Sequence, residues 1–190
     1  MDSLKIKNGV VVGCSSTFIK SAVIPEGVTA IGPRAFMNCS ELRSVALPST
    51  VREIGTQAFW GCESLESINI PSGVVKIGGA AFYSCGSLEE AIIPRGLSVL
   101  EESVYGSCAS IRSVEIPDNI TRIEEFAFTG CILLQEVIIP PSVTWIDKRA
   151  FFCCGNIKRI VIPKHFKIKM GDIFPKEILG LFGGAKVTYI

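Results

Sequence analysis

Apolar and polar positions return along this chain with a period of 23 residues. Proline marks the phase of the repeat, at Pro25, Pro48, Pro71, Pro94, Pro117, Pro140 and Pro163. An aromatic column keeps the same spacing, at Phe36, Phe59, Phe82, Tyr105, Phe128 and Phe151. A cysteine column does so at Cys39, Cys62, Cys85, Cys108, Cys131 and Cys154. Because several phased columns do not coincide by chance, the sequence predicts six full repeats over residues 25–162.

The pattern inside each repeat predicts a short strand followed by turns. Leu42, Val45 and Leu47 alternate with polar residues before Pro48, as expected for a half-buried strand. The proline ends the strand, because it has no N–H to donate to a neighbouring strand. The Ala-Phe-x-x-Cys segment that follows is interpreted as one helical or 3₁₀ turn with its aromatic ring pointing inward.

A unit of 23 residues cannot bury such an apolar face alone, so the units must stack and equivalent residues must form ladders through one elongated core. The sequence therefore predicts an α/β-type repeat solenoid. We expect a right-handed superhelix with a parallel concave sheet and short strand, turn or 3₁₀ segments on its convex side. Residues 1–24 are expected to form an N-terminal cap with the first strand, and 163–190 a degenerate C-terminal cap with a last strand at Val187–Ile190.

The repeated motif also resembles a known family. The pattern L-x-x-V-x-I-P-x-x-V-x-x-I-G-x-x-A-F-x-x-C, seen in Leu65–Cys85, resembles the BspA-like class of leucine-rich repeats, and the resemblance extends over residues 19–166. It implies a leucine-rich repeat superhelix of parallel strands, of the kind carried by surface proteins of host-associated bacteria and anaerobic protists. It also implies adhesion to host or extracellular-matrix proteins, or to other cells.

Charge and hydropathy exclude several classes of partner. Nineteen basic side chains oppose eighteen acidic ones, which gives a net charge of +1. No long-range field for nucleic acid or polybasic membrane patch is therefore expected. No apolar run approaches the roughly 20 residues of a membrane span, and residues 1–13 lack the zones of a signal peptide. We expect a cell-surface or secreted protein whose export signal is absent from this sequence, with the cytoplasm as the alternative.

The concave sheet is the first candidate for a partner-binding site. Its outward columns combine exposed Ile92 and Ile138 with charged residues at the edges, a combination typical of protein interfaces. The bland alternative is that β-branched residues simply favour strands. The expected contact residues are Val23, Arg43, Asn69, Glu90, Ile92, Arg112, Glu115, Glu136, Ile138, Arg159 and Val161.

A second candidate is the residue after each core aromatic. If the aromatic ring points inward, then Met37, Trp60 and Tyr83 point outward and form an apolar ridge. Such a ridge suits a contact, whereas the alternative is local packing against a neighbouring turn or the N-terminal cap. The ridge supports a second hypothesis, a structural or oligomerisation scaffold within a larger surface protein, present as a monomer or a weak homo-oligomer.

The cysteines and acidic residues are weaker candidates for chemistry. Stacked cysteines have parallel Cβ vectors, a poor geometry for bridging, so the ladder is expected to hold buried free thiols. Cys14 and Cys153 lie outside the ladder and are the two that we expect to be open to oxidation. The acidic column Glu101, Glu124 and Asp147, with Glu102 and Glu125 beside it, is either a calcium site or a solvated charged edge. We favour the charged edge, and so expect no metal and no cofactor.

Enzyme activity has little support in the sequence. His165 is the only histidine, so a Ser-His-Asp or Cys-His arrangement has to be built around it. No dinucleotide-binding, phosphate-binding or zinc-ligand motif is present. We therefore predict a protein-binding module for adhesion or host interaction and no enzyme, with a hydrolase centred on His165 as a distant alternative.

Overall fold

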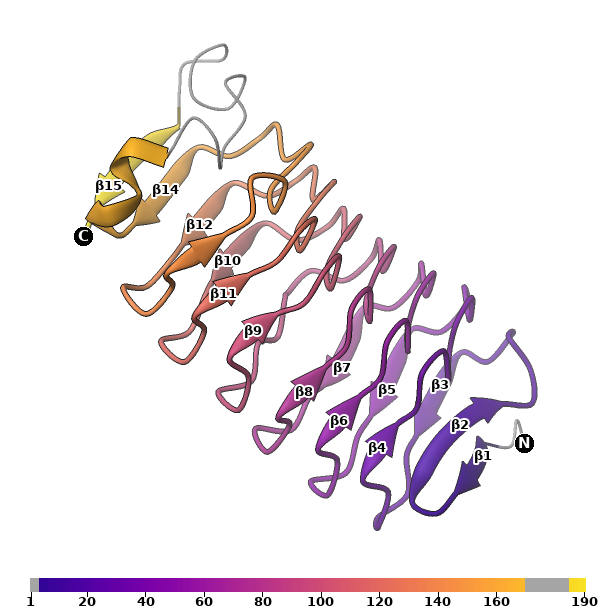
Figure 1. Cartoon of the computed structure of the whole chain (residues 1–190). Coiled ribbons are helices and arrows are strands. Elements are labelled where there is room, and N and C mark those ends of the chain that lie inside the picture. Colours follow the sequence, from indigo (N-terminus) through magenta and orange to yellow (C-terminus); the bar gives the residue numbers. More distant parts are fainter. Residues whose placement is uncertain (1–3, 170–184) are drawn as a thin grey trace.

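The computed structural model describes residues 4–169 and 185–190. The chain winds into a parallel-sheet solenoid of about seven turns (Figure 1). The predicted repeat solenoid is therefore confirmed. Its α/β label is not, because the described residues contain one short 3₁₀ helix, η1 (Lys164–Lys169), and no α-helix. The handedness of the superhelix stays a prediction.

One wall of the solenoid consists of the strands predicted to form the concave sheet, and we call it the β3–β15 face. Its strands are β3 (Ser21–Val23), β5 (Ser44–Ala46), β7 (Ser67–Asn69), β10 (Ser113–Glu115), β12 (Glu136–Ile138), β14 (Arg159–Ile162) and β15 (Lys186–Tyr189). β15 pairs in parallel with β14 and overlaps the last strand predicted at Val187–Ile190. Residues 170–184 of the predicted C-terminal cap lie outside the described residues.

A second wall, the β1–β13 face, lies on the other side of the core. Its strands are β1 (Leu4–Lys7), β2 (Val10–Cys14), β4 (Ala30–Ile31), β6 (Glu53–Ile54), β8 (Lys76–Ile77), β9 (Val99–Leu100), β11 (Arg122–Ile123) and β13 (Trp145–Ile146). The pairing of β1 with β2 is antiparallel, and this hairpin covers the N-terminal end of the solenoid (Figure 1). The other printed strand pairs on both walls are parallel.

The sequence period sets the register of both walls. On the β3–β15 face Ser44 pairs with Ser67 and Val45 with Ile68, so partners are separated by one repeat. The middle residue of each three-residue strand points into the core and its neighbours point outward, as the alternation predicts.

The third side of the solenoid is made of turns, and we call it the turn ladder; it comprises residues 32–39 and their equivalents in later repeats. Here the N–H groups of Arg34, Phe36 and Asn38 donate to carbonyl groups one repeat further on, over 2.7 to 3.1 Å. The predicted helical or 3₁₀ turn is therefore wrong, because two columns of residues have a left-handed backbone that no helix continues. These are Arg34, Gln57, Ala80, Ser103 and Phe126 in one column, and Asn38, Gly61, Ser84, Ser107, Gly130 and Cys153 in the other.

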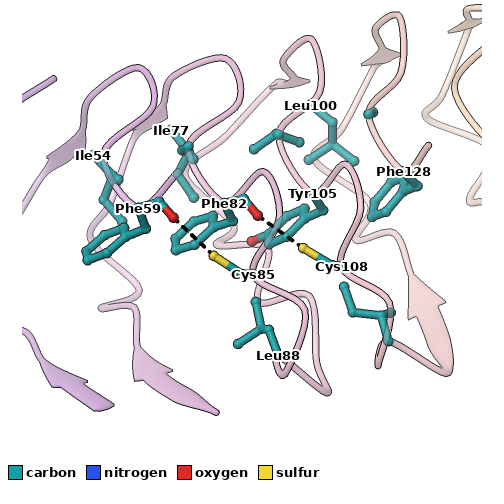
Figure 2. Close-up of a cluster of buried hydrophobic side chains, with 14 of the residues drawn as sticks. Ile54, Phe59, Ile77, Phe82, Cys85, Leu88, Leu100, Tyr105, Cys108 and Phe128 are labelled. Carbon is teal, nitrogen blue, oxygen red and sulfur yellow. Dashed lines mark hydrogen bonds between the residues drawn. The ribbon is translucent and has the colours of Figure 1, made fainter. Parts of the chain in front are cut away.

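The core is a continuous column of stacked aromatic rings, as predicted. Neighbouring rings from Phe36 to Phe151 lie 5.2 to 5.8 Å apart between centroids and within 9° of parallel (Figure 2). All six aromatic residues are 0–1% exposed. Stacking of this kind adds to the free energy gained from burying the rings.

The cysteine ladder lies beside the rings. From Cys62 onward, each ladder thiol donates a hydrogen bond of 3.0 to 3.3 Å to the carbonyl of the aromatic residue 26 positions earlier. Figure 2 shows two of these bonds, from Cys85 to Phe59 and from Cys108 to Phe82. All six ladder thiols are buried, as predicted, and they link successive turns through backbone carbonyls.

Both walls are interrupted at the same region of the solenoid. Residues 89–93, which follow Leu88, do not form a strand, so one sheet ends at β7 and the next begins at β10. On the other wall, β8 and β9 belong to separate sheets. The turn ladder continues across this region, where Ala80, Phe82 and Ser84 donate to the next turn over 2.7 to 3.0 Å. The two parts of the solenoid are thus hydrogen-bonded to each other along one of three sides.

Tyr105 explains the interruption of the β3–β15 face. It replaces the phenylalanine of the aromatic column, and its hydroxyl donates a 2.5 Å hydrogen bond to the carbonyl of Ile92. The equivalent carbonyl of Ala46 accepts from the N–H of Ile24 on the preceding strand. Because the tyrosine hydroxyl takes up the carbonyl of Ile92, this backbone oxygen is drawn toward the core and out of the ladder.

We expect Tyr105→Phe to lower the free energy of unfolding by about 1–2 kcal/mol, because the Ile92 carbonyl loses its hydrogen-bond donor. Urea unfolding followed by circular dichroism measures the change. If stability is unchanged or higher, the Ile92 carbonyl has re-joined the ladder through another donor, and the tyrosine is not what holds it.

We also expect the protein to lose stability at alkaline pH. Burial raises the pKa of Cys62 and of Cys108 to about 12, from an ordinary value of 9.0. Between these values the unfolded chain has lost the two protons and the folded chain still holds them. The unfolding free energy therefore falls as pH rises, by about 1.4 kcal/mol per pH unit for each thiol. Urea unfolding between about pH 8 and about pH 10.5 should show a shallower slope in the Cys62→Ala, Cys108→Ala double variant.

Candidate functional site

The β3–β15 face carries a shallow hollow over its first three strands. Its floor consists of small or short side chains, because serine occupies the same outward column in Ser21, Ser44 and Ser67, and Ala46 lies in the neighbouring column. The hollow has a volume of about 490 Å³ and ends at Glu90 and Ile92. The repeat thus produces a groove wherever three consecutive units have small residues in one column.

A second hollow of about 340 Å³ begins where the first one ends. It lies between segment 89–93 and the start of the next repeat, and its lining includes Ile93, Arg95, Glu115 and Pro117. Glu90 and Ile92 line both hollows. The two hollows therefore meet at the place where the sheet is interrupted, and together they run from β3 to β10.

Charges divide this face into a paired flank and an unpaired centre. Ion pairs join Arg43 to Glu66 (2.7 Å) at one end and Arg159 to Glu136 at the other. Among the described residues, the exposed Glu90 and Glu115 form no salt bridge. The centre of the face therefore presents two free carboxylates beside the half-buried side chain of Ile92.

The predicted contact residues fall into three groups. Val23 is open to solvent, with 77% of its surface exposed. Ile92 and Ile138 are half-buried, whereas Arg112 is exposed beside them on the same face. Asn69 is occupied by its own fold, since its side-chain amide exchanges two hydrogen bonds with the backbone of Leu47 (2.7 and 2.8 Å).

Val161 is a correction to the prediction. We expected it to be an exposed part of the apolar centre, but only 7% of its surface is exposed. Strand β14 is not the edge of its sheet, and Val161 lies in register between Ile138 on β12 and Thr188 on β15. The flanking strands leave Val161 little contact with solvent, so it is removed from the candidate site.

The sequence analysis did not identify the serine column as part of the site. Its three hydroxyls were visible in the alignment of the repeats, but they attracted no attention because serine carries no charge and no large apolar surface. The informative feature is their size: they lie between larger neighbours and so form the floor of a hollow.

The predicted ridge on the turn ladder is less exposed than expected. Met37, Trp60 and Tyr83 are all half-buried. The rings of Trp60 and Tyr83 stack on each other at 4.5 Å between centroids, and Gly106 packs close to the tyrosine ring. A hollow of about 410 Å³ lies beside the pair. The ring faces are thus largely used within the molecule, and the rings present their edges to solvent.

The remaining candidates show no assembled chemistry. The acidic column is partly neutralised, since Arg122 pairs with Glu124 (2.8 Å) and Arg149 with Glu125 (2.5 Å). Within the described ranges, no three His, Cys, Asp or Glu side chains are grouped to hold a metal ion. His165 Nε2 lies 3.0 Å from the carbonyl oxygen of Val143, a backbone partner that gives the imidazole no catalytic role.

No helix in the described part of the chain combines the length and the hydropathy required to cross a bilayer.

Comparisons with known proteins agree with the geometry. The family model described as the BspA type leucine rich repeat region matches in six copies, over residues 6–124 and 100–176. A search of curated proteins gives no match. Among solved structures, the chain is similar to a leucine-rich repeat protein of T. pallidum, with 24% identity, a TM-score of 0.67, and coverage of 92% of this chain and 94% of that one.

It is also similar to the pneumococcal vaccine antigen PcpA, with 20% identity and a TM-score of 0.71, over 90% of this chain and 42% of the antigen. These two likenesses concern the fold. The family match, which spans most of the sequence, adds the repeat type, and the phased proline, aromatic and cysteine columns account for it residue by residue. The chain belongs to the BspA-type leucine-rich repeat family.

Proposed function

We propose that this chain is a protein-binding module that recognises its partner with the β3–β15 face and has no catalytic step of its own. The observation that carries the proposal is the pair of connected hollows on this face, which meet at Glu90 and Ile92. Repeat solenoids provide extended surfaces of this kind, in which each repeat adds one strip of side chains.

The charges on the face favour a particular chemistry in the partner. Glu90 and Glu115 are exposed carboxylates without a salt bridge in the described residues, and apolar Ile92 lies between the two hollows. A partner segment with a lysine or arginine next to an apolar side chain complements this arrangement. Charge complementarity of this type increases the association rate and excludes acidic competitors.

The setting that we propose is adhesion, with the chain exposed on a cell surface or secreted. Membership of the BspA-type family supports this setting. One of the proteins with a similar fold is a vaccine antigen of the pneumococcus, which is consistent with it. We propose host or extracellular-matrix proteins as the partner class.

The test is a binding measurement against a panel of purified extracellular-matrix proteins by surface plasmon resonance. For a matrix protein that binds the wild type, we expect Val23→Asp and Glu90→Lys each to weaken binding about tenfold, equivalent to about 1.4 kcal/mol. Both side chains are exposed, so neither change should disturb the circular-dichroism spectrum. Raising the salt concentration should weaken the wild type more than Glu90→Lys.

Val75→Asp is the matched control, because Val75 is 57% exposed beside β8 on the opposite wall. It should bind like the wild type. Loss of binding in Val75→Asp with full affinity in Val23→Asp would move the binding site to the β1–β13 face. Failure of the whole panel to bind would contradict the adhesion setting.

A scaffold role through the Met37, Trp60 and Tyr83 ridge remains the second prediction. Half-buried aromatic edges beside a hollow offer a surface for self-association. Sedimentation velocity over about a hundredfold range of concentration should then show dimers that Trp60→Ala weakens. A strict monomer over the whole range argues against the ridge as a self-contact.

A further inference from the structure

The cysteine ladder ends differently at its first member. In later repeats each thiol donates to the carbonyl of the aromatic residue 26 positions earlier, as Cys62 does to Phe36 (3.1 Å). The residue 26 positions before Cys39 is Gly13, in the capping hairpin and outside the aromatic column. Cys39 bonds elsewhere: its sulfur lies 3.5 Å from the sulfur of Cys14.

The two thiols differ in their access to solvent. Cys14 is the last residue of β2 and is half-buried, whereas Cys39 is 0% exposed within the core. The other cysteine outside the ladder, Cys153, is exposed, and no contact with a second sulfur is printed for it. Cys14 thus combines partial exposure with direct contact to another thiol, the arrangement of a thiol that attacks and one that resolves.

We propose that Cys14 and Cys39 form a reversible disulfide that ties the N-terminal hairpin to the first repeat, made by exchange with a low-molecular-weight disulfide of the glutathione type. The thiolate of Cys14 attacks one sulfur of the oxidant, forms a mixed disulfide and releases one thiolate. Cys39 then gives its proton to solvent and attacks the Cys14 sulfur, which releases the second thiolate. One external disulfide is reduced to two thiols as two protein thiols are oxidised.

The environment of Cys39 gives the order of the two steps. Burial raises the pKa of Cys39 well above its ordinary value, and the hydrogen bond and charge of Cys14 raise it further. Cys39 therefore stays protonated while Cys14 is a free thiol. Once Cys14 carries the mixed disulfide, the contributions of its thiol to the pKa of Cys39 disappear, and Cys39 becomes easier to ionise next to the sulfur that it must attack.

The link also has a structural consequence. A disulfide between these residues closes a loop over β3 and β4 and fixes the hairpin β1–β2 against the first turn of the solenoid. The end of a repeat protein is where unfolding starts most easily, because the terminal unit has a neighbour on one side. In an oxidising compartment the cap is therefore locked, and in a reducing one it is free to open.

The test treats reduced, folded protein with oxidised glutathione and maps the products after alkylation and trypsin digestion. The two cysteines fall in separate tryptic peptides, 8–20 and 35–43, so a crosslinked pair of these peptides identifies the bond. We expect this pair, a loss of about 2 Da from the intact protein, and a rise of about 5 °C in melting temperature that dithiothreitol reverses.

The controls separate the bond from other oxidation. Cys153→Ser should form the same crosslink, since this exposed thiol takes no part. Cys14→Ser and Cys39→Ala should lose both the crosslink and the rise in melting temperature, and Cys14→Ser tests the proposal even if Cys39→Ala folds poorly. Glutathione adducts on Cys14 without the crosslinked peptides, or a crosslink from Cys14 to any other cysteine, would overturn the proposal.

Discussion

The fold depends on one constraint, that equivalent atoms of successive repeats lie one above the other. The spacing of 23 residues holds without insertion from Pro25 to Pro163, so each ring stacks on a ring and each thiol reaches a carbonyl of the preceding turn. An extra residue in one repeat would shift every later column of that repeat out of register. The cost would extend to both neighbours, because each turn is hydrogen-bonded on both sides.

Much of the architecture could be predicted from the sequence, because the same residue types recur in phase. The aromatic column, the buried thiols and the strand before each proline all follow from burial patterns in single columns. The turn ladder could not be predicted in the same way. Arg34, Gln57 and Ala80 share a left-handed backbone, yet nothing in their side chains indicates it, and the neighbours across the ladder hold them there.

The candidate site was only partly predictable, for a similar reason. Alternation along a strand identifies which residues point outward, and it selected Val23, Glu90 and Ile92 correctly as members of the hollowed face. It does not identify what covers them, so Val161 was assigned to an open surface that its neighbours in fact cover. Nor does it indicate that one hydroxyl on Tyr105 takes a carbonyl out of the sheet. Such effects depend on contacts between repeats, which no single column records.

The interruption of both walls also bears on mechanics. A solenoid bonded along three sides resists bending in every direction, whereas one bonded along a single side bends most easily about that side. Here the turn ladder is the continuous side, and the break in the walls separates the two hollows of the β3–β15 face. Small changes in curvature at this joint would alter the spacing between the hollows, so partners of somewhat different length could be accommodated without unfolding a repeat.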